Sequence, residues 1–120
     1  HIDATKSQMI VGSWVSVMEG WGTPERSGNL KVVDLNTKIV KNLGPDKSIG
    51  NLDGVEADGK GAYFVTDWSA GKLYSMKNNS KVKVLKSTAK GAADHEVILD
   101  KNLILIPIMT EGKVIALKIN

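Results

Sequence analysis

The sequence predicts an all-β protein built of propeller blades, and three observations lead to this fold class. No stretch of the 120 residues shows sustained helical periodicity. Clusters of turn-forming residues recur about every 8 to 12 residues, as in proteins made of short strands. The segments that begin at Gly28, Gly71 and Gly112 are similar, and these glycines are 43 and then 41 residues apart. A repeat slightly above forty residues with about four strands per unit is typical of propeller blades.

The middle repeat shows most clearly how one blade is built. Asp58-Gly59 and Gly71 mark tight turns, because these residue types tolerate the positive φ that hairpin turns require. Short apolar segments lie between the turns. We therefore expect four antiparallel strands, lettered a to d from the propeller axis outward, at residues 54–57, 62–68, 72–77 and 81–86.

The first and last repeats are less complete than the middle one. In the first, we expect a strand a around residues 1–3, followed by strands at residues 8–17, 29–35 and 37–43. In the last, we expect strands a to c and no strand d. The strands of the last repeat are at residues 95–99, 103–109 and 113–119, and the three blades span residues 1–44, 45–88 and 89–120.

Three blades cannot close a ring, because propellers have four to eight blades. An open array would leave apolar blade faces and unpaired strand edges exposed. We therefore expect a six-bladed ring. Either this chain is part of a longer polypeptide, or two copies associate as a homodimer that completes the propeller.

Composition and charge exclude several classes of partner and site. The net charge of +3 comes from lysines spread along the chain, Arg26 is the only arginine, and no aromatic stacking platform is evident, so nucleic-acid binding is not expected. No apolar run approaches the ~20 residues of a membrane span. The absence of cysteine excludes disulfides, zinc–thiolate sites and a cysteine nucleophile. The chain begins with His1, so the sequence does not decide whether a signal peptide precedes it.

Two aspartates occupy equivalent positions at the starts of two predicted a strands. The offset of 41 residues that aligns the middle and last repeats places Asp53 onto Asp94. Both carboxylates are then expected at the mouth of the central channel, where Asp53 is a candidate metal ligand and Asp94 a candidate ligand-binding residue. Oxygen ligands of this kind suit Ca²⁺ or Mg²⁺. The alternative is that Asp53 caps its own turn through a hydrogen bond to the backbone.

Three further residues are candidates for chemistry or structure. His95 is a candidate general base, and the alternative is a histidine in the blade wall that is hydrogen-bonded to the backbone. Trp21 lies in an insertion, residues 18–27, that we expect on the same face as Asp53. There its indole would stack on a sugar or another flat ligand, or else cover a hydrophobic spot. Asp67 is interpreted as structural, and the equivalent residues Trp14 and Trp68 are expected to pack between blades.

Residues 51–68 and the segment Gly71-Lys72-Leu73-Tyr74 resemble the superfamily of senescence marker protein, gluconolactonase and luciferin-regenerating enzyme. Residues 92–118 are similar to the closing blade of its bacterial, often exported, branch. The resemblance implies a six-bladed propeller of which this chain covers the C-terminal half. It also implies a periplasmic or secreted location.

The same resemblance implies a divalent metal, usually Ca²⁺, in the channel and hydrolysis of sugar lactones. Asp53 in Leu52-Asp53-Gly54 matches the metal-binding Asp of the family's Pro-Asp-Gly motif, with Leu52 in place of proline. The Glu and Asn ligands of the family would lie before His1. Two readings of function follow: metal-dependent lactone hydrolysis at the channel, or a non-catalytic propeller module (or an inactive fragment) that binds a ligand or a protein.

Overall fold

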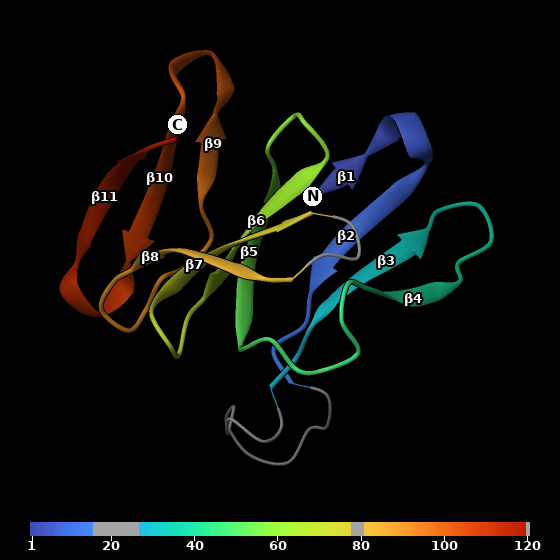
Figure 1. Cartoon of the computed structure of the whole chain (residues 1–120), viewed down its shortest axis with the longest axis horizontal. Helices are drawn as coiled ribbons and strands as arrows, with labels where there is room; N and C mark the ends of the chain where they lie inside the picture. The colour runs from blue at the N-terminus through green and yellow to red at the C-terminus, as the bar shows by residue number, and fades with distance from the viewer. Residues whose placement is uncertain (16–26, 78–80, 120) are drawn as a thin grey trace.

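A computed structural model of the chain describes residues 1–15, 27–77 and 81–119. The described chain is all-β, as the sequence predicts, and forms three antiparallel sheets of four, four and three strands. Figure 1 shows the three sheets side by side, the first in blue to teal, the middle one in green to yellow and the third in orange to red. In the described residues no helix has the length and apolar character of a membrane span.

Each sheet is formed by consecutive strands, so that spatial order follows chain order, as in a propeller blade. Short 3₁₀ turns at Ala4–Lys6, Leu99–Lys101 and Met109–Glu111 connect some of the strands. The first sheet contains β1 (Ile2–Asp3), β2 (Gln8–Gly12), β3 (Leu30–Asp34) and β4 (Val40–Leu43). The middle sheet contains β5 (Leu52–Ala57), β6 (Ala62–Asp67), β7 (Lys72–Lys77) and β8 (Lys83–Ser87), and the third contains β9 (Glu96–Ile98), β10 (Leu103–Ile108) and β11 (Lys113–Lys118).

Two strands of the first sheet are shorter than the sequence predicts, and side-chain hydrogen bonds explain the difference. Strand β2 ends at Gly12 rather than near residue 17. Beyond it the Ser13 hydroxyl donates to the Asn29 carbonyl (2.8 Å) and accepts from the Asn29 N–H (2.9 Å). Strand β4 begins at Val40 rather than at Thr37, because the Asp34 carboxylate accepts the N–H of Thr37 (2.8 Å) within a turn.

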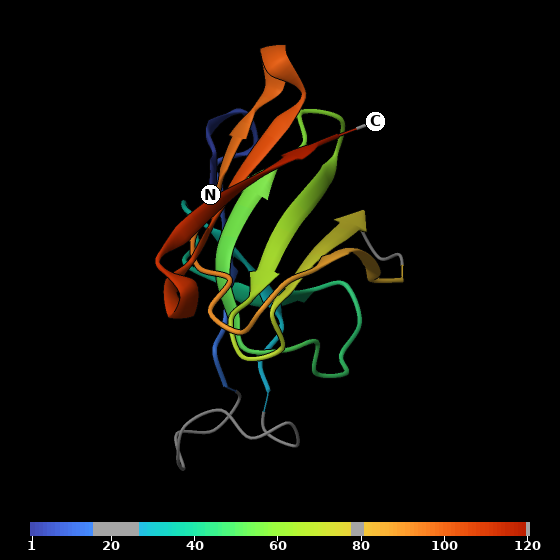
Figure 2. The same ribbon diagram turned by 90° about the vertical axis from the view of Figure 1, so that its left-hand side faces the viewer.

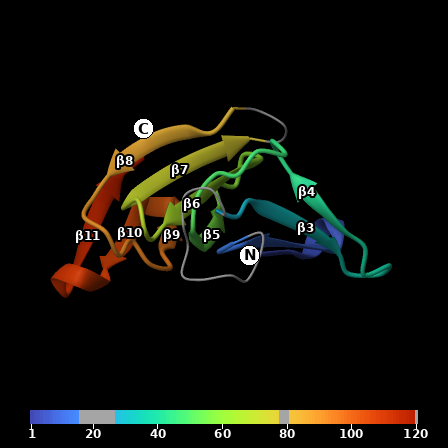
Figure 3. The same cartoon turned by 90° about the horizontal axis from the view of Figure 1, so that it is seen from below.

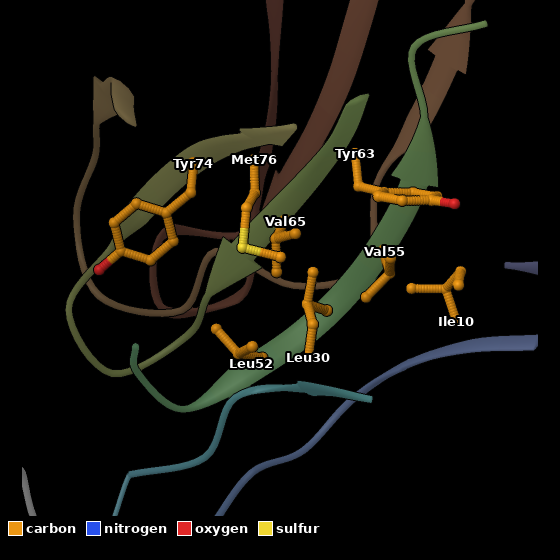
Figure 4. Close-up of a cluster of buried hydrophobic side chains, with 8 residues drawn as sticks. All are labelled: Ile10, Leu30, Leu52, Val55, Tyr63, Val65, Tyr74 and Met76. Atoms are coloured by element: carbon orange, nitrogen blue, oxygen red, sulfur yellow. The ribbon is translucent and has the colours of Figure 1, made fainter. Parts of the chain in front are cut away.

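The middle sheet packs against the first sheet through one of its faces. Ile10 on β2 and Leu30 on β3 are 2% and 0% exposed. They enter a cluster on one face of the middle sheet, formed on β6 and β7 by alternate residues, since side chains at positions i and i+2 of a strand share a face. On β5 the irregularity between Leu52 and Val55 brings both residues to this face. Figure 4 shows this cluster, whose middle-sheet members are Leu52, Val55, Tyr63, Val65, Tyr74 and Met76.

The opposite face of the middle sheet packs against the third sheet. Phe64 on β6 and Leu73 on β7 are 4% and 0% exposed. They join Ala92 and the inward side chains of β10, namely Ile104, Ile106 and Ile108. Figure 2 shows the third sheet in front of the middle sheet, and in Figure 3 the three sheets spread as a fan. The middle sheet is therefore covered on both faces.

We predict that Leu73→Ala lowers the free energy of unfolding by about 2–4 kcal/mol, because it leaves a cavity between the middle and third sheets. Urea denaturation followed by tryptophan fluorescence measures the change. Val84→Ala on β8 is the control, since Val84 is 49% exposed, and it should cost less than about 1 kcal/mol. Equal losses in the two variants would contradict the two-sided packing of the middle sheet.

Candidate functional site

The structure brings the two predicted aspartates together where the middle and third sheets meet. Asp53 lies at the start of β5, beside an irregularity in the pairing of β5 with β6. The N–H of the following residue, Gly54, donates to the buried Thr66 hydroxyl (2.8 Å) and so fixes this part of the strand. Asp94 lies just before β9 and influences the titration of Asp53 directly. The prediction that these two carboxylates share one region of the fold agrees with this geometry.

Gly54 permits the close approach of the two segments. A Cβ atom at this position would lie 2.7 Å from Asp94 Oδ1, 2.7 Å from His95 Nδ1 and 2.8 Å from the Asp94 Cα. The last contact involves backbone and cannot be relieved by a change of rotamer. A side chain at position 54 would therefore push the Asp94 segment away from Asp53.

The Asp53 carboxyl group has a raised pKa. Partial desolvation of the carboxyl is the larger cause, although the Asp53 residue as a whole is exposed; the negative charge of Asp94 is the second cause, and the backbone N–H of Asp94 acts in the opposite direction. Within the described part of the chain, the Asp53 carboxylate accepts no hydrogen bond from its own turn. The Asp94 carboxylate accepts the N–H of His95 (3.1 Å). Among the described residues, no lysine, arginine or histidine forms an ion pair with either aspartate. The pair is therefore an uncompensated concentration of negative charge.

His95 lies beside this pair but is buried, with 4% of its surface exposed. Neither ring nitrogen has a hydrogen-bond partner among the described groups, which differs from the backbone-bonded histidine considered above. Burial lowers the pKa of the ring, while the carboxylates of Asp94 and Glu56 act to raise it. The histidine is therefore held in its neutral form against Gly54.

A cleft of about 360 Å³ opens next to the aspartates and is bounded on the other side by β2. His1 and Glu56 also line it, and His1 Nδ1 lies 3.1 Å from Glu56 Oε2. The sequence analysis did not single out Glu56. The repeat offered one signal for Glu56. Glu56 pairs with Phe64 across β5 and β6, and in the third sheet another glutamate, Glu96, pairs with Leu105, the residue equivalent to Phe64.

The described residues supply only part of a metal site. Among them no group of three or more His, Cys, Asp or Glu side chains is arranged to hold a metal ion. Asp53 and Asp94 offer hard carboxylate oxygens of the kind that Ca²⁺ prefers. A cation at this position would relieve the repulsion between them, so the donor set fits a hard divalent ion but needs further oxygen ligands.

Trp21, the predicted stacking residue, lies outside the described residues, and only the base of its insertion is seen. Val15 and Ser27 pair in an isolated bridge, and Gly28 pairs with Gly50, just before β5. The side chain of Asn51 also donates to the Trp14 carbonyl (2.8 Å). The described residues on either side of residues 16–26, Val15 and Ser27, therefore lie next to the segment that leads into Asp53.

Asp67 has the structural role that the sequence indicates. It is 3% exposed, accepts the N–H of Ala70 (3.0 Å) and accepts the hydroxyl proton of Tyr74 (3.1 Å). Burial, followed by the charge of Asp67, raises the pKa of Tyr74. Asp67 thus holds the β6–β7 turn, and its carboxylate is engaged there rather than beside Asp53 and Asp94.

The two tryptophans expected to pack between blades do so. The rings of Trp14 and Trp68 lie 5.8 Å apart, centre to centre, at an angle of 52°. Trp68 Nε1 also donates to the sulfur of Met109 (3.4 Å), and the Lys90 ammonium lies 5.1 Å from the Trp68 ring centre. These contacts join the ends of all three sheets.

Comparisons with known proteins add no family assignment: no protein-family description, no curated protein and no solved structure matches the chain. The site is therefore interpreted from its own geometry.

We predict that Asp53→Asn stabilises the protein at neutral pH in the presence of a chelator. Because the pKa of Asp53 is raised in the folded state, its carboxyl contributes most to stability when protonated, and that contribution falls as the pH rises through the pKa. The variant should therefore have the higher urea midpoint at neutral pH and the same midpoint as the wild type in acid.

Asp100→Asn is the matched control, since Asp100 is exposed like Asp53 but lies in the turn after β9, outside the cleft that Asp53 and Asp94 line, and should show no such pH-dependent gain. A wild type that is as stable as Asp53→Asn at neutral pH would contradict the repulsion between Asp53 and Asp94.

Proposed function

We propose that the chain forms three blades of a six-bladed propeller that binds Ca²⁺ or a similar divalent cation near its axis and hydrolyses lactones such as sugar lactones. The observation that carries the proposal is the pair Asp53 and Asp94, two adjacent carboxylates without a cationic partner among the described residues. The resemblance of residues 51–68 to gluconolactonase-like proteins supports the reaction type.

Each part of the site has a defined task in this proposal. Asp53 and Asp94 would hold the cation, and Gly54 keeps them close together. A bound divalent cation supplies Lewis-acid polarisation of a lactone carbonyl and lowers the pKa of a bound water. Val55 also lines the cleft and offers an apolar contact for the rest of the lactone ring.

A second function, ligand binding without turnover, is favoured by the burial of His95. The ring is 4% exposed and both nitrogens are enclosed, so this histidine offers no general base at the surface of the cleft. In this case Asp53 and Asp94 would bind a cation or a polar ligand, and the propeller would act as a binding module.

Calorimetric titration with Ca²⁺, combined with a pH-stat assay on a sugar lactone, tests both functions. We expect the wild type to bind Ca²⁺ and to lose lactone hydrolysis in EDTA. Asp53→Asn and Asp94→Asn should each weaken Ca²⁺ binding by about tenfold or more, because each removes one of the two charged ligands. Asp100→Asn should behave as the wild type.

The outcomes separate the two functions. Ca²⁺ binding that depends on Asp53, without any lactone turnover, would favour the binding module. The absence of both Ca²⁺ binding and turnover would overturn the proposed cation site.

A further inference from the structure

The two sheet–sheet interfaces inside the chain are built from equivalent residues. In the first sheet Ile10 and Leu30 project into the middle sheet, and in the middle sheet Phe64 and Leu73 project into the third. Leu30 and Leu73 are separated by the same 43 residues as the repeated glycines. We call such a pair, one residue on strand b and one on strand c, the projecting pair of a blade.

The third sheet has the same projecting pair, but nothing in the described chain covers it. An offset of 41 residues carries Phe64 onto Leu105 and Leu73 onto Val114. Leu105 is partly exposed and Val114 is 62% exposed, whereas the four projecting residues of the other two sheets are between 0% and 4% exposed. On this face Ile98, Ala116 and Pro107 are uncharged neighbours, whereas Glu96 pairs with Leu105 and Lys118 pairs with Leu103. Within the described chain, the outer face of the third sheet is thus an unpartnered surface with an apolar centre between two charged residues.

The first sheet presents the complementary face, which no described residue covers. In the middle sheet the receiving face contains Tyr63, Val65 and Met76, which are buried by the projecting pair of the first sheet. The equivalent receiving residues of the first sheet are partly exposed, and their neighbours Ile2 and Val40 are 63% and 58% exposed. These receiving residues are Met9, Val11 and Val33, with Lys31 in place of Tyr74.

We propose that the second copy of this chain covers both surfaces, so that the third sheet of each copy packs on the first sheet of the other. The projecting pair Leu105 and Val114 would then meet Met9, Val11 and Val33 of the second copy. This contact would reproduce, for a third time, the interface that the chain already forms twice. A two-fold axis along the propeller axis satisfies both contacts at once, which gives a closed dimer rather than an open chain of copies.

The shape of the chain fits this closure. Its Cα extents are 39 × 39 × 22 Å, and the 22 Å dimension is the vertical direction of Figure 3, in which the sheets spread as a fan. Two such fans joined across the short dimension would measure twice 22 Å by 39 Å, which is close to the outline of a round disc. Each copy would then contribute half of the ring.

The inference rests on the six-bladed ring of the proposed function, but not on the cation or on lactone hydrolysis. Closure would bring the second copy's Asp53 and Asp94 to the same end of the axis. A group of three or more ligands is lacking among the described residues of one copy, and this arrangement would supply it. A dimer that binds no Ca²⁺ would refute only the cation site, whereas a monomer that binds Ca²⁺ would refute only the dimer.

Mass measurement of the intact 120-residue chain by light scattering and native mass spectrometry tests the proposal. We expect a dimer of twice 12.9 kDa. Val114→Lys should shift the protein to the monomer, with the dissociation constant raised at least about tenfold, because it places an ammonium on the apolar projecting surface, which packs on a receiving face that already carries Lys31. Circular dichroism verifies that the variant is folded, and the exposure of Val114 in one copy makes folding of the variant the expected result.

A mixing experiment tests which face meets which. Lys31→Glu places a carboxylate on the receiving face, so a mixture of Val114→Lys with Lys31→Glu has one complementary contact and one wild-type contact. We expect a mixed dimer in native mass spectra, although Val114→Lys alone is monomeric. Val84→Lys is the matched control, since Val84 is a similarly exposed valine on the outer strand β8, and it should remain dimeric.

Three results would overturn the proposal. One is a wild type that stays at 12.9 kDa at its highest soluble concentration, which would indicate that blades of a longer polypeptide cover these faces. Another is a dimer that Val114→Lys leaves intact or that Val84→Lys disrupts equally. The third is a failure of the mixed pair to associate.

Discussion

The structure depends on the burial of both faces of the middle sheet. All six residues of β6 are buried, which requires apolar packing on each side of a single strand. The first sheet covers one side through Ile10 and Leu30, and the third covers the other through Ile106 and its neighbours. Within residues 1–15, 27–77 and 81–119 each outer sheet is covered on one face only. The middle sheet is therefore the centre of the array, and the outer sheets form its two end surfaces.

The repeat made much of this arrangement predictable. Similar segments that recur at a fixed spacing form equivalent strands. The offset of 41 residues that aligns Gly71 with Gly112 therefore predicted that β10 and β11 pair in the same way as β6 and β7. Strand ends were less predictable. The Ser13 hydroxyl and the Asp34 carboxylate compete with the ladder for backbone groups, and periodicity does not report such local hydrogen bonds.

The candidate site was predictable only in part, for a related reason. Equivalence placed Asp53 and Asp94 in one region of the fold, because repeated positions in neighbouring blades lie side by side. The burial of His95 and the participation of Glu56 depend on how closely the sheets approach at Gly54. That distance is set by packing between sheets, which the order of residues along one strand does not reveal.

The position of Trp68 gives the molecule an internal optical reporter. Its indole touches Trp14 of the first repeat, the sulfur of Met109 in the third and the Lys90 ammonium, so one ring contacts groups from all three repeats. Two indoles in such close, tilted contact couple their electronic transitions, and a nearby sulfur or ammonium group perturbs the emission of the ring. Separation of either outer blade from the middle one would therefore change the near-ultraviolet circular dichroism of the tryptophan pair or the emission of Trp68, without any added label.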